Sequence, residues 1–157
     1  MNQGVIMNLI TSTVNHMAFI LAGNSTFTVV NEKSERLTYK VTAPSLKNGT
    51  TKRDYAANVR FVSVMTGPDN EKSYTFIGTI FINDKVFRYS PKSKLNRDAL
   101  SVEAFDFIFY QIAHEGLEER LTFHHEGKCA RCGRKLTVPE SIKSGFGPEC
   151  ESIVGGV

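Results

Sequence analysis

The chain of 157 residues has no tryptophan, three cysteines and five prolines. Three cysteines exclude a fully paired intramolecular disulfide framework, because one thiol is always left over. A large excess of one sign of charge is also absent, because 19 Lys and Arg against 16 Asp and Glu leave a net charge of +3. Bulk charge therefore makes no case for a nucleic-acid or membrane partner, and only the position of the charges can do so. The composition is that of an ordinary globular chain, 41% hydrophobic.

Long hydrophobic runs are absent as well. The longest run near the front is residues 17–23, far short of the roughly 20 residues that cross a bilayer. The first 32 residues contain no Lys or Arg, whereas a secretory signal needs basic residues ahead of its apolar stretch. We therefore expect a cytoplasmic protein without a membrane partner, in which thiols stay reduced and can bind a metal.

Short strand patterns separated by turn residues fill most of the chain before residue 90. They predict strands over residues 17–23, 26–30, 36–44, 59–65, 72–82 and 85–89. One long helix is expected over residues 101–115, with an apolar stripe at Phe105, Ile108, Phe109 and Ile112. Ser101 is its expected N-cap and Gly116 its C-cap.

These elements predict an α+β fold, in which an antiparallel β-meander is packed by one long helix and followed by a zinc-knuckle subdomain. The expected division is an N-terminal segment of residues 1–16, partly disordered, a core domain of residues 17–120 and a zinc-knuckle module of residues 121–157. No internal repeat or low-complexity segment is evident in the sequence.

All three cysteines lie in the last fifth of the chain. Cys129-Ala130-Arg131-Cys132-Gly133 has the spacing of a knuckle, a tight turn whose backbone amides point at two thiolates and whose glycine permits a positive φ. Zn²⁺ needs two further ligands to complete a tetrahedron, and Cys150 is the obvious third. The segment has too little apolar material to fold alone, so we expect the metal to order it.

His124 and His125 precede the knuckle and compete for the fourth position. Strand alternation sends the two side chains to opposite sides, and Gly127 between His125 and the knuckle favours His125. Glutamates near the knuckle are weaker candidates, because a site with three soft or borderline ligands usually takes histidine or cysteine as the last.

Other interpretations of the cysteines are incidental thiols or a Cys-x-x-Cys redox pair, and the histidine together with the third cysteine weighs against both. The zinc deaminases also place a Glu near a histidine, but this chain lacks their Pro-Cys-x-x-Cys context. Four available protein ligands favour a closed, structural zinc site. The remaining histidines, His16 and His114, are isolated, and no catalytic constellation is suggested, so we do not expect an enzyme.

Residues 125–150 resemble DUF6011, a family of zinc-binding domains without an agreed activity. The resemblance covers about a sixth of the chain and rests on Cys129, Cys132, Gly133, Arg134, Leu136, Thr137, Pro139, Ser141, Gly145, Gly147, Pro148 and Cys150. It implies a zinc site and a bacteriophage or mobile-element origin, which would place the protein in the cytoplasm of a bacterial host cell. It implies no activity.

Charge is segregated along the chain. Residues 85–97 carry five basic residues and no acid, and residues 98–119 carry six acids and no Lys or Arg. Either a basic strand and loop face an acidic helix across the fold, or the basic segment is a patch for phosphates. The tentative contact residues are the basic side chains of the knuckle and of this segment: Lys128, Arg131, Arg134, Lys135, Lys143, Arg88, Lys92 and Lys94.

Two functions compete on these observations. The first is a small non-enzymatic, phage-type zinc-binding accessory protein that binds nucleic acid or a nucleic-acid-handling complex, as zinc knuckles do through basic side chains and backbone amides. The second is an anti-defence inhibitor that binds and blocks a host protein, such as a CRISPR or other antiviral nuclease complex. Steep salt dependence of binding would favour the first.

Overall fold

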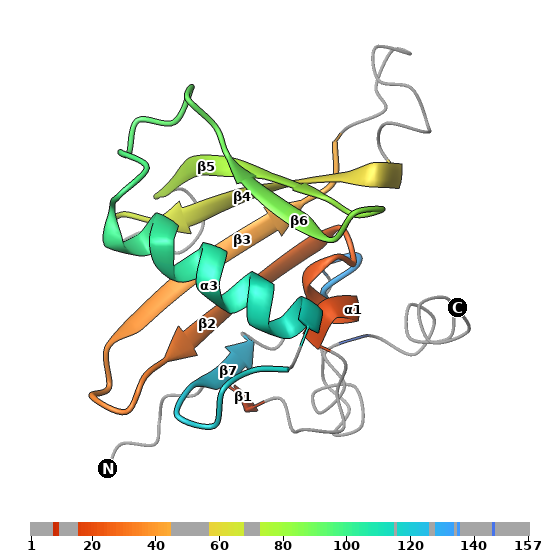
Figure 1. Cartoon of the computed structure of the whole chain (residues 1–157). Coiled ribbons are helices and arrows are strands. Elements are labelled where there is room, and N and C mark those ends of the chain that lie inside the picture. Colours follow the sequence, from red (N-terminus) through yellow and green to blue (C-terminus); the bar gives the residue numbers. More distant parts are fainter. Residues whose placement is uncertain are drawn as a thin grey trace.

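The computed structural model describes residues 8–9, 16–44, 57–67, 73–114, 116–125, 128–133, 135 and 146. Its elements are β1 (Asn8–Leu9), α1 (His16–Ile20), β2 (Asn24–Val30), β3 (Arg36–Thr42), β4 (Val59–Met65), β5 (Tyr74–Phe81), β6 (Val86–Tyr89), α3 (Leu100–His114) and β7 (Thr122–His125). The strands form one sheet in the order β1-β7-β2-β3-β4-β5-β6, and both helices lie on one of its faces (Figure 1). The expected α+β architecture is confirmed.

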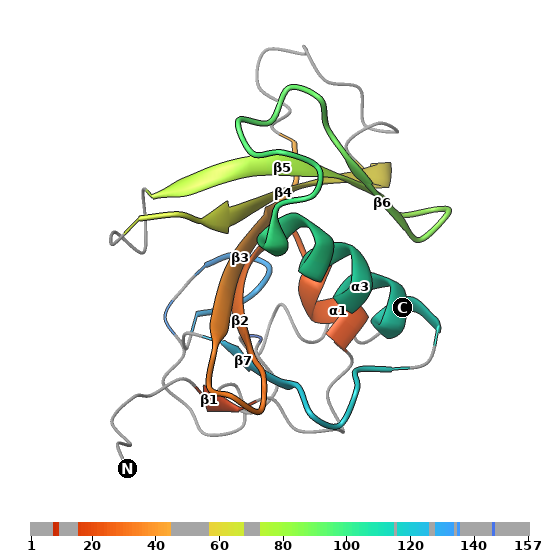
Figure 2. The ribbon, with the colours of Figure 1, turned by 60° about the vertical axis from the view of Figure 1, so that its left-hand side comes forward.

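Strands β2 to β6 are a continuous antiparallel meander. Tyr39 and Val41 of β3 are buried on the helix side, while Thr38 and Lys40 alternate to the other face. The register shifts by one residue between Val62 and Ser63 of β4, and such a bulge increases the local twist. Figure 2 shows the result: β4, β5 and β6 run across the top of the molecule at a steep angle to β2 and β3, so the sheet curves around α3.

Helix α3 (Leu100–His114) lies within one residue, at each end, of the predicted range 101–115, and Phe105 is the centre of its packing. The Phe105 ring lies 4.9 Å from the ring of Tyr39 and 4.8 Å from the ring of Phe87, centroid to centroid. The stripe residues Ile108 and Phe109 are also buried. Burial of such side chains contributes about 1.5–3 kcal/mol each, so this stripe fixes the helix on the sheet.

Of the two caps predicted for α3, the structure contradicts the N-cap and confirms the C-cap. The Ala99 carbonyl accepts the first amides, those of Val102 and Glu103, so Ser101 lies inside the first turn and its predicted N-cap role is wrong. The Ser101 carbonyl instead accepts a 2.7 Å hydrogen bond from the Tyr39 hydroxyl. At the other end Gly116 has φ +90° and donates its amide to the Gln111 carbonyl, which confirms the predicted glycine cap.

The strand predicted over residues 17–23 is wrong, because the chain forms the short helix α1 there. Phe19 and Ile20 are adjacent in the sequence and both are fully buried, so two successive side chains of this short helix belong to the core. A short apolar run does not distinguish a buried helix from a buried strand by periodicity. Gly23, at φ +122°, then turns the chain into β2.

The edge of the sheet joins the two ends of the described chain. β7 pairs with β2 from Phe27 opposite His125 to Val30 opposite Thr122, and β1 pairs with the outer side of β7. The predicted boundary at residue 120 thus falls just before a strand of the sheet. No helix in the described part of the chain is long and apolar enough to span a membrane.

Candidate metal centre

The Cys129–Gly133 turn has the local geometry that the sequence predicts for a knuckle. The Arg131 amide points at the Cys129 sulfur, with 3.4 Å between N and Sγ. Gly133 has φ +80°, and its amide donates to the Cys129 carbonyl at 2.8 Å. Lys128 and Lys135 pair across the base of the turn. The turn thus directs a backbone amide at the first sulfur, as the knuckle geometry requires.

The knuckle is attached to the beginning of β2 rather than projecting from the fold. The Asn24 amide donates to the Ala130 carbonyl at 2.8 Å, and both Cys129 and Ala130 are buried. A Cβ at Gly133 would lie 2.7 Å from the Asn24 side-chain nitrogen, so that side chain would have to move, and the φ of +80° itself favours glycine. Cys132 is exposed, which places the turn at the border between core and solvent.

Strand β7 orients the two candidate histidines as predicted. His125 is fully buried on the side of Phe123, whereas His124 is half-buried on the opposite face. The His124 Nε2 atom lies 2.9 Å from the Thr122 hydroxyl. Of the two histidines, only His125 faces the core that also contains Cys129.

Phe19 of α1 connects the separate parts of this region. Its ring centroid lies 5.7 Å from that of His125, 5.5 Å from that of Phe123 and 6.0 Å from that of Phe146. Phe146 is four residues before Cys150 in the sequence. Phe19, Cys129 and Phe146 belong to the same hydrophobic cluster. Nothing local in the sequence marks this role of Phe19, since the apolar run over residues 17–23 predicts a strand.

The predicted ligand set is only partly within the described residues, since Cys150 lies outside them. Among the described residues, no group of three or more His, Cys, Asp or Glu side chains is close enough to hold a metal ion. The metal ligands therefore stay a prediction. His125, Cys129 and Cys132 are all described, and the structure does not bring these three side chains within reach of one ion. Their chemical types, an imidazole and two thiols, are ones that Zn²⁺ takes as ligands.

The predicted basic contact residues fall into two groups at opposite ends of the sheet. Lys128, Arg131 and Lys135 are exposed on the knuckle, at the end where β2 begins. Strand registers place the start of β6 at this same end, so Lys92 and Lys94, which follow β6, are exposed at the other end. Arg88 is exposed on β6 between them, and Arg134 and Lys143 lie outside the described residues.

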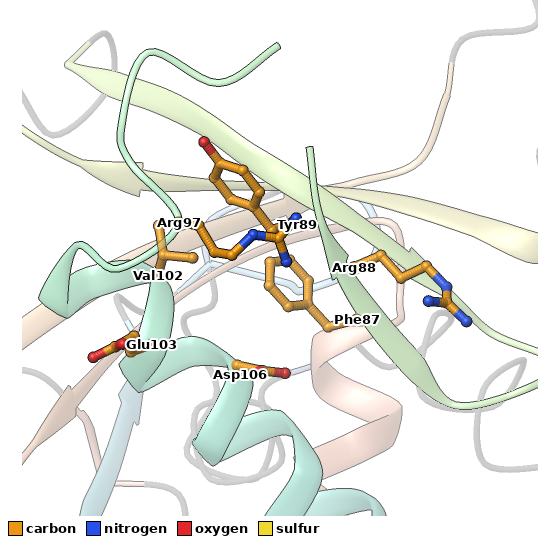
Figure 3. A pocket seen from close by; sticks show the side chains of 7 residues that line it. All are labelled: Phe87, Arg88, Tyr89, Arg97, Val102, Glu103 and Asp106. Carbon is orange, nitrogen blue, oxygen red and sulfur yellow. The ribbon is translucent and has the colours of Figure 1, made fainter. Parts of the chain in front are cut away.

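The basic segment and the acidic helix do face each other. A cavity of about 440 Å³ lies between α3 and β6 with its following loop. Arg97 is on one side of this cavity, and Glu103 and Asp106 are on the other (Figure 3). The Arg97 guanidinium lies over the Tyr89 ring, 4.9 Å from its centroid. The interpretation of two solvated charged surfaces that meet across the fold is thus the one that the geometry favours.

His16 and His114, which are isolated in the sequence, each pack against an aromatic ring. His16 packs on Phe123 with 4.6 Å between ring centroids, and burial lowers its pKa. His114 ends α3, donates from Nδ1 to the Tyr110 carbonyl at 2.9 Å and stacks on the Tyr110 ring. Neither arrangement supplies a nucleophile and base pair to a substrate.

Comparison with known proteins finds one family. Residues 119–155 match the model described as a family of unknown function, DUF6011. The resemblance of the C-terminal segment is therefore confirmed, and the match begins just before β7. No curated protein and no solved structure matches the chain.

Proposed function

We propose that His125, Cys129, Cys132 and Cys150 hold one structural Zn²⁺, and that this non-enzymatic centre presents a basic knuckle to nucleic acid. The observation that carries the proposal is the Cys129–Gly133 turn, with its amide aimed at the Cys129 sulfur. Four protein ligands leave no open coordination position for a reactive water. The metal would supply cross-linking and no chemistry on a substrate.

The role of zinc in this proposal is to fasten the last part of the chain to the edge of the sheet. Within the described part of the chain, the Asn24 amide joins β2 to the knuckle by its hydrogen bond to the Ala130 carbonyl. Metal binding contributes directly to folding when the site forms only in the folded chain. A zinc ion shared by β7, the knuckle and residue 150 would therefore stabilise this edge.

The nucleic-acid contact is proposed for Lys128, Arg131 and Lys135, with Arg134 and Lys143 of the same segment. The first three are exposed on one short turn, so a single stretch of phosphates could meet all of them. Each phosphate neutralised releases counterions, which makes such binding salt-dependent. Lys92 and Lys94 at the far end of the sheet provide a matched control.

The metal assignment is tested by zinc content per chain in matched histidine variants. His125→Asn is expected to lose zinc, and His124→Asn is expected to retain it, because only the former side chain faces the core with Cys129. Cys132→Ser and Cys150→Ser should also lose it. Zinc retained in His125→Asn, or absent from the unaltered protein, would reject this ligand set.

The nucleic-acid contact is tested by titration of single-stranded DNA and RNA at several salt concentrations. Replacing Lys128, Arg131 and Lys135 by Ala should reduce the slope of log K against log salt by about 2, since each single-strand phosphate contact contributes about 0.7. Lys92→Ala with Lys94→Ala should leave the slope unchanged. Flat salt dependence, or no binding at all, would contradict the proposal.

The second candidate function, a chain that binds and blocks a protein of an antiviral nuclease complex, has a different observation in its favour. Helix α3 exposes three large apolar side chains, Leu100, Phe107 and Tyr110. Exposed apolar surface of this kind marks protein contacts rather than phosphate contacts.

A further inference from the structure

The outer face of α3 carries large apolar side chains in contact with solvent. Leu100 is 75% exposed, Tyr110 60% and Phe107 49%. Their spacing places them on one side of the helix, opposite the buried Phe105 and Phe109. α3 already has a complete apolar stripe against the sheet, so these three residues are not needed for its packing.

A groove lies beside this exposed face, between α3 and the β2–β3 hairpin. It has a volume of about 290 Å³. Its floor is formed by Val29 and Leu37, which are directly opposite each other in the β2–β3 register. Its walls are apolar and come from Ala104, Phe107, Ile108 and Leu121. The exposed face and the groove together are called the α3 groove below.

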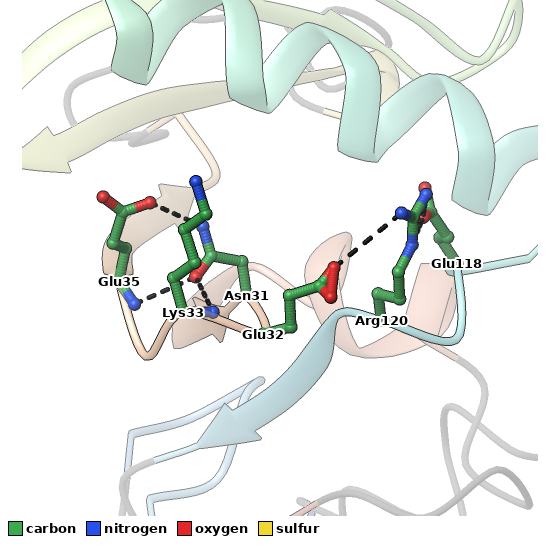
Figure 4. A network of polar contacts seen from close by, with 6 residues as sticks. All are labelled: Asn31, Glu32, Lys33, Glu35, Glu118 and Arg120. Carbon is green, nitrogen blue, oxygen red and sulfur yellow. Dashed lines mark hydrogen bonds and ion pairs between the residues drawn. The ribbon is translucent and has the colours of Figure 1, made fainter.

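Polar contacts hold the two loops that border the α3 groove (Figure 4). The Asn31 side-chain oxygen accepts the amides of Lys33 and Glu35 at 2.9 and 3.0 Å, and its nitrogen donates to the Glu35 carboxylate at 2.8 Å. Arg120 pairs with Glu118 and reaches Glu32 at 3.7 Å. The Asn31 contacts order the hairpin turn, and the exposed Arg120–Glu32 pair is a weak link from that turn to the loop after α3.

The charges around the α3 groove are mainly acidic. α3 has exposed Glu103 and Asp106 and contains no Lys or Arg. The groove itself is lined by Glu35, Glu118 and Arg36, and Glu118 is paired with Arg120. Glu103 and Asp106 also line the cavity toward β6, where Arg97 lies on the opposite side. An apolar groove with acidic borders is complementary to an apolar segment flanked by basic side chains.

We propose that the α3 groove binds an amphipathic helical segment of a partner protein, with an apolar stripe flanked by Lys or Arg. An amphipathic helix fits an apolar groove through side chains spaced by three and four residues. A second copy of this chain is disfavoured as occupant, because two α3 faces brought together would oppose Glu103 and Asp106 of one copy to those of the other. This inference goes beyond the proposed function and does not depend on the zinc centre.

The test uses synthetic 18-residue helical peptides with the full-length protein as purified. One peptide has a leucine stripe flanked by lysines and a single Trp, a second has glutamates in place of the lysines, and a third is a scrambled form of the first. Because the chain itself contains no Trp, peptide fluorescence reports binding directly. The lysine peptide is expected to bind at least tenfold more tightly than the other two.

Variants then distinguish a shaped groove from general stickiness. Phe107→Ala should weaken binding about tenfold. Ala104→Leu fills the groove while adding apolar surface, so it should also weaken binding if the groove has a defined shape. The double variant Glu35→Gln with Glu103→Gln should weaken binding of the lysine peptide several-fold and reduce the salt dependence of that binding. Arg88→Ala, exposed on β6, is the control and should have no effect.

Three results would overturn the proposal. Equal binding of the lysine and scrambled peptides, or unchanged binding in Ala104→Leu, would exclude a shaped helix site. Concentration-dependent dimerisation of the protein in sedimentation experiments, abolished by Phe107→Ala, would assign the face to a second copy.

Discussion

The meander β2–β6 with α3 and the edge formed by β7, β1 and the knuckle share one hydrophobic core, but their strands are joined differently. In the meander each strand pairs with the next one in the chain. At the edge β2 pairs with β7, almost a hundred residues later, and β7 pairs with β1. Closing such long loops costs conformational entropy before any contact forms. The edge is therefore where an additional cross-link would stabilise most.

The largest effects should come from a matched pair of buried phenylalanines, one from each region. Phe105→Ala removes the ring between α3 and the sheet, and Phe19→Ala removes the ring that contacts His125 and Phe146. Each is expected to lower the free energy of unfolding by about 3–5 kcal/mol, measured by urea denaturation. Only Phe19→Ala should also weaken zinc binding. Equal loss of zinc affinity in both would mean that the two regions unfold as one.

Glycines with positive φ give the next largest effect. Gly133→Ala and Gly116→Ala each force a Cβ into a left-handed conformation, which costs about 1–2 kcal/mol. Space is open around Gly116, whereas the Cβ at position 133 meets the Asn24 side chain. Zinc affinity should fall only in Gly133→Ala, as measured by competition with a chelator. Unchanged zinc affinity in Gly133→Ala would show that the conformation of this turn does not contribute to metal binding.

Tyr39 tests the meander alone. Its hydroxyl donates to the Ser101 carbonyl, so Tyr39→Phe should cost about 0.5–1.5 kcal/mol. Burial raises the pKa of Tyr39 above its usual value of 10.0. The unfolded chain therefore loses this proton first, so the contribution of Tyr39 to stability should be constant below pH 10 and fall as the pH rises above it. Tyr110→Phe, at an exposed ring, is the control for both measurements. An alkaline loss that persists undiminished in Tyr39→Phe would contradict this assignment.

The smallest effect is expected at the surface. Arg120→Ala removes the ion pairs with Glu32 and Glu118, which are solvent-exposed and worth about 0–1 kcal/mol. Thermal unfolding should shift little, and less still in high salt. A large loss of stability would show that the two loops contribute to the core.

The sequence predicts the meander and α3 better than it predicts the edge of the sheet. Residues 59–65 were predicted as a strand and form β4 with those bounds, and α3 differs from its prediction by one residue at each end. Both depend on local patterns. The short apolar run that contains Phe19 was assigned to the wrong element, and the position of β7 beside β2 has no local signal. Pairing between distant segments is decided by the whole core, which a single sequence does not display.

The candidate site was predictable in its local geometry and not in its surroundings. The Cys-x-x-Cys-Gly spacing predicted the amide directed at sulfur and the positive φ of Gly133, and strand alternation predicted that His125 and His124 face apart. The attachment of the knuckle to Asn24 and the contacts of Phe19 depend on tertiary packing, and neither residue is marked in the sequence. The separation of the two basic groups likewise depends on the direction of β6.

The central claim is that zinc stabilises the edge of the sheet and not the meander. Amide hydrogen exchange of the zinc-loaded protein, compared with the protein treated with a chelator, tests this most directly. We predict that removal of zinc abolishes protection of the Asn24 amide, which donates to Ala130, and of β7, while β4 amides remain protected. Unchanged protection at Asn24, or equal loss in β4 and β7, would contradict the claim.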